Sequence, residues 1–178
     1  QLNCDRHAGN IMVKFDDNGD PVPVPIDHGG SLPKREDFGR MKGRIGAVID
    51  GPGGMEIVNC LLTLPAAYDA FDPELLAQLE LLDPAAIEQG MKRQRAAMDV
   101  VHPTLGAGAK VPDDSLHLSK RAMMFMKRAA PMMSPAEIQI ALAQRGEELF
   151  DAADNVFDTV ADKVIADFVP MKQAYREI

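Results

Sequence analysis

The sequence has few cysteines and aromatic residues, and it lacks any long apolar run. Its 178 residues include two cysteines, no tryptophan and 5% aromatic residues. Because Cys4 and Cys60 form neither a CxxC pair nor a cysteine–histidine cluster, the sequence predicts neither a zinc site nor a disulfide framework. A bilayer-spanning helix needs about 20 apolar residues, and no run approaches that length. These absences favour a single soluble domain in the cytoplasm.

The charge of the chain also excludes a class of partners. Its formal net charge of -8 at pH 7 disfavours nonspecific nucleic-acid binding, which depends on Lys and Arg side chains that neutralise phosphates. We therefore expect no nucleic-acid partner, and any affinity for an anion must come from a local group of basic residues. Because a dense polar motif follows Gln1 almost at once, we expect the chain to be the C-terminal part of a longer polypeptide.

Two polar motifs near the start of the chain flank strand-like residues. The first, NCDRHAGNIMV, covers residues 3–13, and the second, PIDHGG, covers residues 25–30. Between them, the β-favouring runs IMVKF and VPVPI surround DDNGD, whose Asn18-Gly19 pair predicts a hairpin with a type I′ turn. The prolines of the second run favour an edge strand. DDNGD lacks the full calcium-loop pattern, so it predicts a solvent-exposed turn.

The polar residues of these motifs are of the types that phosphoryl transfer uses. Transfer from ATP needs a carboxylate beside the acceptor hydroxyl and oxygen ligands for Mg²⁺, and Asp5, Asn10 and Asp27 can supply them. The predicted hairpin would bring Asp27 back beside Asn10. The spacing from Asp5 to Asn10 equals that of the protein-kinase catalytic loop, H-R-D-x-x-x-x-N, and Asp27-His28-Gly29 occupies the place of D-F-G.

DRHAGNIMV and PIDHG, followed by Leu32-Pro33, together resemble the phosphatidylinositol 3- and 4-kinase superfamily. The pattern is most similar to the type II phosphatidylinositol 4-kinases and their plant relatives, and the similarity covers about residues 3–33. The resemblance implies a mostly α fold with a small β-hairpin, as in the C-terminal (large) lobe of a protein-kinase-like fold. The N-terminal lobe of the same polypeptide, with the glycine-rich loop and the strand lysine, would precede the first residue. Residues 1–33 would form the catalytic loop, the hairpin and the metal loop. Residues 34–55 would form the activation-type loop, and residues 56–178 the helical part.

The same resemblance implies a role for each polar residue of the motifs. Asp5 would be the catalytic base, and His7 would assist charge stabilisation or proton transfer. Asn10 and Asp27 would hold magnesium against the triphosphate of ATP. The implied activity is an ATP- and Mg²⁺-dependent kinase that transfers the γ-phosphate to an alcohol acceptor.

The segment after the second motif is locally basic. It is rich in glycine and weak in apolar periodicity, which predicts a long loop over residues 29–55. Between residues 34 and 44 the segment carries five basic residues against two acidic ones, Glu36 and Asp37, which is a local net charge of +3. The charge suits a solvated loop and an anion-facing loop equally well. Under the resemblance it is an activation-type loop that meets a phosphoinositide headgroup, with peripheral membrane contact, or an acidic protein substrate. The basic residues are Lys34, Arg35, Arg40, Lys42 and Arg44.

Two other functions fit the same residues. The acceptor could be a protein Ser or Thr, as in bacterial kinases of the HipA type, which have a related Asp-to-Asn loop. The order IDHG and then LP favours the lipid-kinase branch. A non-catalytic, kinase-like interaction module is the other alternative, and the intact set of Asp5, Asn10 and Asp27 argues against it.

From about Met55 onward the pattern is helical. Asp72-Pro73 and Asp83-Pro84 each predict an N-cap followed by a proline at the first helical position. The second of these helices should end before His102-Pro103. Its expected apolar face consists of Ile87, Met91, Met98 and Val101.

Two further helices are expected towards the end of the chain. The first covers LHLSKRAMMFMKRAA, and Ser134 with Glu137 predicts a capping box at the start of the next. An apolar stripe continues from there towards Pro170, with a break expected near Gly146; it consists of Leu142, Leu149, Val156, Val160 and Val164. The methionines are expected to fill the core. They are Met123, Met124, Met126, Met132 and Met133.

Overall fold

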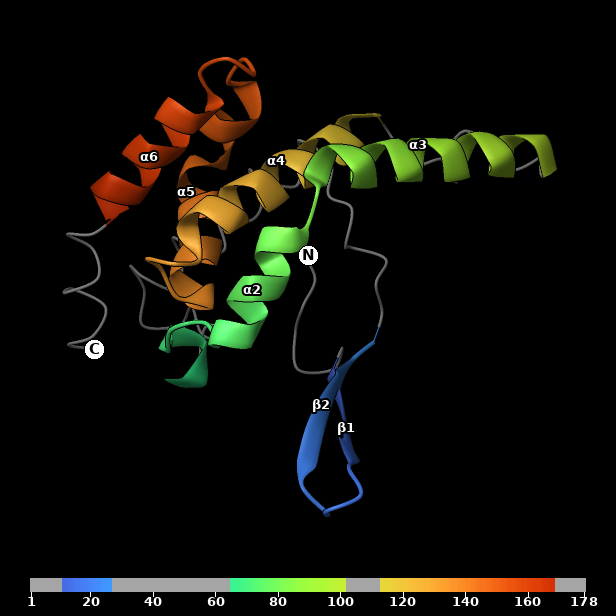
Figure 1. The fold of residues 1–178 in the computed structure, drawn as a ribbon, viewed down its shortest axis with the longest axis vertical. Coiled ribbons are helices and arrows are strands. Elements are labelled where there is room, and N and C mark those ends of the chain that lie inside the picture. Colours follow the sequence, from blue (N-terminus) through green and yellow to red (C-terminus); the bar gives the residue numbers. More distant parts are fainter. Residues whose placement is uncertain (1–10, 27–64, 102–112, 169–178) are drawn as a thin grey trace, which may run out of the picture.

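The fold is a group of helices with a separate β-hairpin (Figure 1). This is a computed structural model, and it describes residues 11–26, 65–101 and 113–168. The described residues are mostly helical with one two-stranded antiparallel sheet, which is the secondary structure expected from the sequence. The assignment to a kinase lobe stays a prediction. The elements are β1 (Ile11–Phe15), β2 (Pro21–Pro25), η4 (Pro65–Tyr68), α2 (Pro73–Leu81), α3 (Pro84–Val101), α4 (Asp113–Ala129), α5 (Pro135–Asp151) and α6 (Phe157–Phe168).

Aspartate side chains start both α2 and α3. The Asp72 carboxylate accepts a hydrogen bond of 2.8 Å from the backbone N–H of Glu74. The Asp83 carboxylate accepts bonds of 2.9 and 3.1 Å from the backbone N–H groups of Ala85 and Ala86. These N–H groups have no carbonyl partner within a helix, so the aspartates satisfy donors that would otherwise depend on water. Both predicted caps are confirmed.

A capping box starts α5. The backbone N–H of Ser134 donates to the Glu137 carboxylate at 2.8 Å, and the backbone N–H of Glu137 donates to the Ser134 hydroxyl at 3.4 Å. Both residues are buried, so the box also satisfies polar groups that water does not reach. This prediction is confirmed as well.

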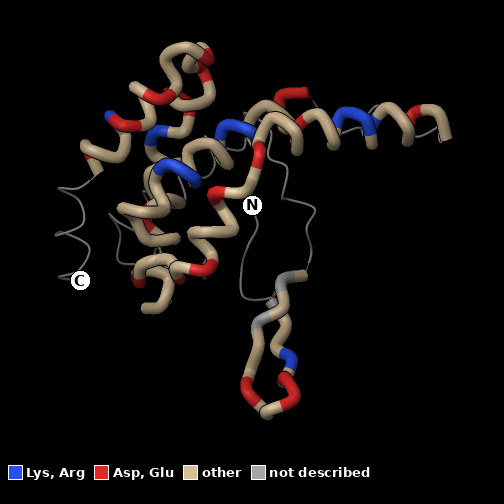
Figure 2. The backbone as a smooth tube through the Cα atoms, in the orientation of Figure 1, with Lys and Arg blue, Asp and Glu red and all other residues tan. Residues whose placement is uncertain are grey.

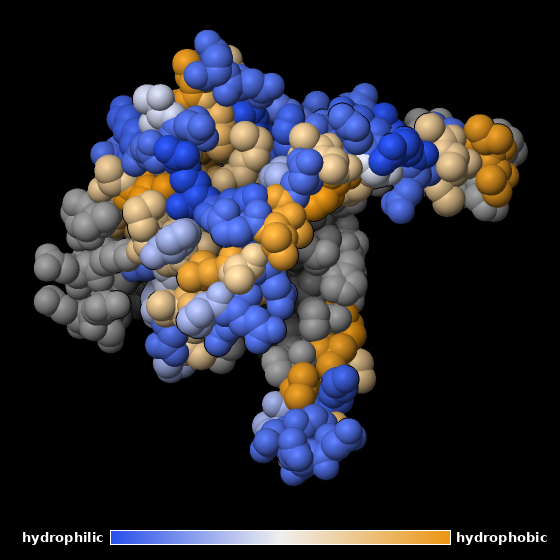
Figure 3. All heavy atoms as spheres, in the orientation of Figure 1, coloured by the Kyte–Doolittle hydropathy of each residue, from blue (hydrophilic) through white to orange (hydrophobic). Residues whose placement is uncertain are grey.

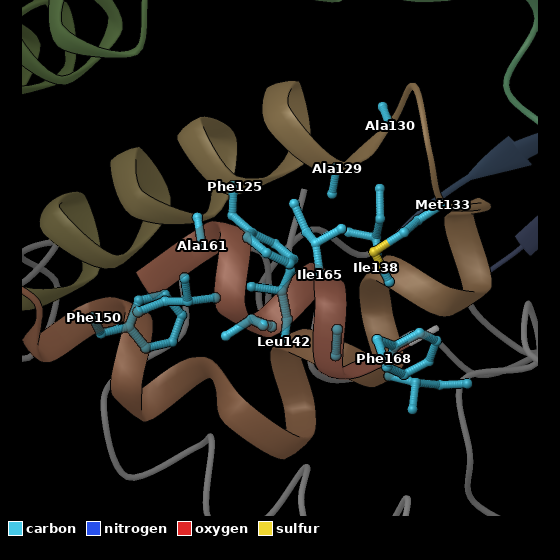
Figure 4. Packing of buried hydrophobic residues seen from close by; sticks show 14 of the residues in the cluster. Phe125, Ala129, Ala130, Met133, Ile138, Leu142, Phe150, Ala161, Ile165 and Phe168 are labelled. Carbon is cyan, nitrogen blue, oxygen red and sulfur yellow. The ribbon is translucent and has the colours of Figure 1, made fainter. Parts of the chain in front are cut away.

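The core lies between α4, α5 and α6 (Figure 4). Phe125 of α4, Leu149 of α5 and Phe157 of α6 are fully buried in it. The methionines fill it only in part. Met133 is buried and Met124 and Met126 pack against the cluster, whereas Met132 is exposed in the turn that follows α4.

The predicted break near Gly146 is wrong. α5 continues through this residue to Asp151, and the chain leaves the helix at Ala152, whose backbone is extended. A glycine inside a helix costs only about 1 kcal/mol relative to alanine. Burial of Leu142 and Leu149 on either side of Gly146 exceeds that cost. The break falls after Ala152 instead, so Val156 lies in the turn and is exposed rather than part of the stripe.

α3 packs against α4, and its C-terminal end projects beyond the other helices (Figure 1). None of its residues is buried. Ile87 and Met91 are half-buried, whereas Met98 and Val101 are exposed, so only part of the expected apolar face is covered. Figure 3 shows hydrophobic side chains at the projecting end.

Ion pairs hold α3 against α4. Glu88 lies 2.7 Å from the Lys92 ammonium and 3.4 Å from that of Lys120 on α4, and Arg95 lies 2.6 Å from the Asp113 carboxylate. The hydrogen bond from Lys92 and the charge of Lys120 lower the pKa of Glu88, and they outweigh the opposing effect of desolvation. The ion pairs with Lys120 and Asp113 therefore help to hold α3 against α4, where little apolar surface is buried.

A buried arginine connects α4 to the turn between α5 and α6. The side chain of Arg121 is 2% exposed, and its guanidinium donates to the carbonyl oxygen of Ala152 at 2.7 Å and to the Asp154 carboxylate. The guanidinium carbon also lies 4.7 Å from the centre of the Phe157 ring. These contacts fix where α5 ends relative to α6.

Candidate functional site

The hairpin is the described part of the predicted phosphoryl-transfer site. β1 and β2 pair antiparallel over five residues each, with Ile11 opposite Pro25, Val13 opposite Pro23 and Phe15 opposite Pro21. The pairing confirms the predicted hairpin. Within the described residues the sheet has two strands, so β2 is an edge strand there, as its prolines predict.

The turn of the hairpin differs from the predicted type I′ turn at Asn18-Gly19. The backbone N–H of Gly19 donates to the carbonyl oxygen of Asp16, so Asp16 and Gly19 are the first and last residues of the turn. Gly19 has a positive φ of 84° and leads into β2. A turn followed by a residue in the left-handed region is typical of a three-residue hairpin loop. The type I′ prediction is therefore wrong, although the position of the turn is right.

The side chain of Asp16 explains this choice of turn. Its carboxylate accepts hydrogen bonds of 2.9 Å from the backbone N–H groups of both Asn18 and Asp20. An aspartate that binds the backbone two residues on stabilises a turn that starts at its own position. This preference of aspartate for the first turn position was the sequence signal that outweighed the Asn-Gly pair.

The register places both ends of the hairpin side by side. Because Ile11 pairs with Pro25, the chain enters and leaves the hairpin at the end opposite the turn. Asn10 immediately precedes Ile11 in the sequence, and Asp27 follows Ile26. The register of the described strands is compatible with the prediction for Asn10 and Asp27, which themselves lie outside the described residues.

All the predicted site residues lie outside the described residues. This applies to the catalytic and metal-binding candidates, Asp5, His7, Asn10 and Asp27. It also applies to the basic candidates of the substrate loop, Lys34, Arg35, Arg40, Lys42 and Arg44. Their roles stay predictions.

The described residues contain no second site of the same kind. Within residues 11–26, 65–101 and 113–168, no group of three or more His, Cys, Asp and Glu side chains could hold a metal ion. Asp16, Asp17 and Asp20 are exposed at the hairpin turn, where the Asp16 carboxylate is engaged by backbone N–H groups. Over the same ranges, no helix is long and apolar enough to cross a membrane.

Comparison with known proteins indicates a relation to phosphatidylinositol kinases over a short stretch. A stretch of 32 residues is 56% identical to phosphatidylinositol 4-kinase gamma 4 of Arabidopsis thaliana. It covers 18% of this chain and 6% of the plant protein, so the similarity concerns a small part of that relative. No protein-family model and no solved structure matches the chain.

Proposed function

We propose that this chain belongs to an ATP-dependent phosphotransferase of the phosphatidylinositol 4-kinase type, which transfers the γ-phosphate of ATP to an alcohol acceptor. Two observations support the proposal. The residues that phosphoryl transfer needs occur in order in the sequence, and a short stretch of the chain is similar to a protein named as a phosphatidylinositol 4-kinase. The matched stretch is about as long as the segment from residue 3 to residue 33 that carries the motifs.

The hairpin register is a structural observation that is compatible with the proposal. It pairs Ile11 with Pro25, and a single residue, Ile26, separates that pair from Asp27. A shift of the register along the strands would separate the chain positions of Asn10 and Asp27. The observed register puts Ile11 and Pro25, the described strand ends nearest to them in the sequence, together at one end of the hairpin, which supports a shared cation site.

The donor set fits magnesium. Asn10 and Asp27 offer an amide oxygen and a carboxylate, which are the hard oxygen ligands that Mg²⁺ takes beside substrate phosphates. The bound ion would neutralise charge on the phosphates. Asp5 would accept the proton of the acceptor hydroxyl and orient its oxygen, and His7 would assist charge stabilisation or the proton transfer.

The positive charge of the basic segment suggests which acceptor the enzyme would use. Lys34, Arg35, Arg40, Lys42 and Arg44 concentrate positive charge in a chain whose net charge is -8. A positive segment beside the transfer site would attract the anionic headgroup of a phosphoinositide and bring the protein to the surface of a cytoplasmic membrane. We therefore propose a lipid acceptor and peripheral membrane contact.

An acceptor assay tests the proposal. The natural polypeptide that carries this sequence is given labelled ATP and Mg²⁺ with phosphatidylinositol vesicles, and separately with a mixed protein substrate. We expect label in the lipid. We also expect Asp5→Ala to reduce turnover by orders of magnitude while nucleotide binding is retained, because Asp5 acts on the acceptor rather than on ATP.

The other results of this assay decide between the alternatives. Label in the protein substrate would replace the lipid acceptor by a Ser or Thr side chain. If neither acceptor is labelled although the protein binds the vesicles, the chain would belong to a non-catalytic interaction module, and the proposal would be contradicted.

A further inference from the structure

The two edges of the hairpin differ in their capacity to bind another strand. The backbone N–H of Asp16 donates to the carbonyl oxygen of Asp20 across the hairpin, which fixes the phase of the antiparallel pattern. Backbone groups in such a pair point alternately towards the partner strand and away from it. The even-numbered residues of both strands therefore face the partner strand, and the odd-numbered residues face outwards.

This phase closes the outer edge of β2. Its three outward-facing positions are Pro21, Pro23 and Pro25, and proline has no backbone N–H to donate. A further strand cannot form a regular ladder with an edge that lacks all its donors.

Within residues 11–26, 65–101 and 113–168, no strand pairs with the outer edge of β1. Val13 and Phe15 carry outward-facing N–H and C=O groups, and within the described residues the sheet ends at β1. Their side chains are 60% and 70% exposed and lie on one face of the hairpin, next to Pro21. An isolated two-stranded hairpin is marginally stable in water, so a third strand on this edge would stabilise it.

The charge of the turn specifies the chemistry of that strand. Asp16, Asp17 and Asp20 are all exposed, and Lys14 is the one basic residue in the described hairpin (Figure 2). An added strand that reaches the turn would meet these carboxylates, so a basic residue there would be favourable.

We propose that the outer edge of β1 binds an extended peptide segment with alternating apolar residues and a basic residue next to the Asp16–Asp20 turn. Backbone hydrogen bonds to Val13 and Phe15 supply affinity, and the carboxylates of the turn select the basic residue.

A second copy of this chain fits the edge less well. If two β1 strands paired antiparallel about Val13, the residues opposite Asp16 and Asp17 would be the uncharged Asn10 and Gly9 of the second copy. Pairing about Phe15 would set Lys14 of the second copy opposite Asp16, but it would leave Asp17 and Asp20 without a basic partner. Charge complementarity therefore favours a basic peptide over a homodimer.

The test is peptide binding to the natural polypeptide that carries this sequence. The probe is a dye-labelled synthetic peptide that has N-terminal lysines followed by alternating valine and threonine, and the control probe has glutamates in place of the lysines. Fluorescence anisotropy measures the affinity of each. We expect the lysine peptide to bind more tightly, and we expect added salt to reduce the difference.

Two sets of variants separate the edge from the turn. Val13→Pro removes one outward N–H but no hydrogen bond to β2, and it should weaken binding about fivefold, whereas Val13→Thr, which keeps the N–H, should not. If Val13→Pro disrupts the hairpin, the double variant Asp17→Asn and Asp20→Asn still tests the proposal, because it should abolish the preference for the lysine peptide. Equal binding of both peptides by the unmodified chain would overturn the proposal. A dimer that Val13→Pro dissociates would assign the edge to a second copy and would overturn it too.

Discussion

The ion pair between Arg121 and Asp154 should show a large difference between the costs of removing its two partners. The Arg121 side chain is 2% exposed, whereas that of Asp154 is 80% exposed. Arg121→Ala removes the charge-assisted bond to the Ala152 carbonyl, worth about 2 kcal/mol, and the contact with the Phe157 ring, worth about 1 kcal/mol. We expect the free energy of unfolding to fall by about 3 kcal/mol.

Removal of the carboxylate should have a much smaller effect. Asp154→Asn keeps the side-chain volume and an acceptor oxygen, and the lost attraction is screened because Asp154 faces water. We expect a cost of less than about 1 kcal/mol. The guanidinium keeps its bond to the Ala152 carbonyl in this variant.

Urea denaturation followed by circular dichroism measures both costs. Arg128→Ala is the matched control, because Arg128 lies on the same helix and pairs with Asp162 and Asp158 while its side chain is 38% exposed. We expect this control to cost about 1 kcal/mol or less. Similar losses for Arg121→Ala and Arg128→Ala, or a loss for Asp154→Asn as large as that for Arg121→Ala, would refute the assignment of Arg121 as the buried connection between α4 and the turn after α5.

Three further predictions concern the cap, the turn and pH. Ser134→Ala should lower the free energy of unfolding by about 1 kcal/mol, measured by the same denaturation, because Ser134 caps α5; an unchanged midpoint would contradict this. Gly19→Ala should cost about 1 kcal/mol because Gly19 has a φ of 84°, and amide exchange in the hairpin should become faster. The folded-state pKa of Glu88 is depressed below 4.5, chiefly by Lys92, so its contribution is present above the unfolded pKa and is lost as pH falls through the lower folded pKa. The stability difference between the unmodified chain and Glu88→Gln should therefore shrink as the pH falls from about 6 through the unfolded pKa towards the lower folded pKa, and a constant difference would contradict the pairing.

The features that the sequence predicts correctly depend on neighbours a few residues apart. Asp72, Asp83 and the Ser134–Glu137 pair each bind backbone groups within the first turn of their own helix, so residue type and spacing are sufficient. The hairpin follows from two β-favouring runs and a glycine that tolerates a positive φ.

The features that the sequence does not predict depend on distant contacts. Arg121 is buried by a turn more than 30 residues further on, as its bond to Ala152 shows, and no local pattern marks a buried arginine. The exposure of the last turns of α3 could not be predicted either, because an apolar pattern does not show whether another element covers that face of the helix. The roles of Asp5, His7, Asn10 and Asp27 likewise depend on how separate segments meet, so they are proposed from the motif and from the hairpin register.

The most direct test of the central claim is γ-phosphate transfer by the natural polypeptide and its Asp27→Ala variant at saturating Mg²⁺ and ATP, with phosphatidylinositol vesicles as acceptor. Asp69→Ala is the matched control, because Asp69 is an exposed aspartate beside η4 and far along the chain from the motifs. We predict that Asp27→Ala abolishes transfer while its unfolding midpoint stays unchanged, and that Asp69→Ala is as active as the unmodified protein. Transfer by Asp27→Ala at the unmodified rate would contradict the assignment of Asp27 as a magnesium ligand.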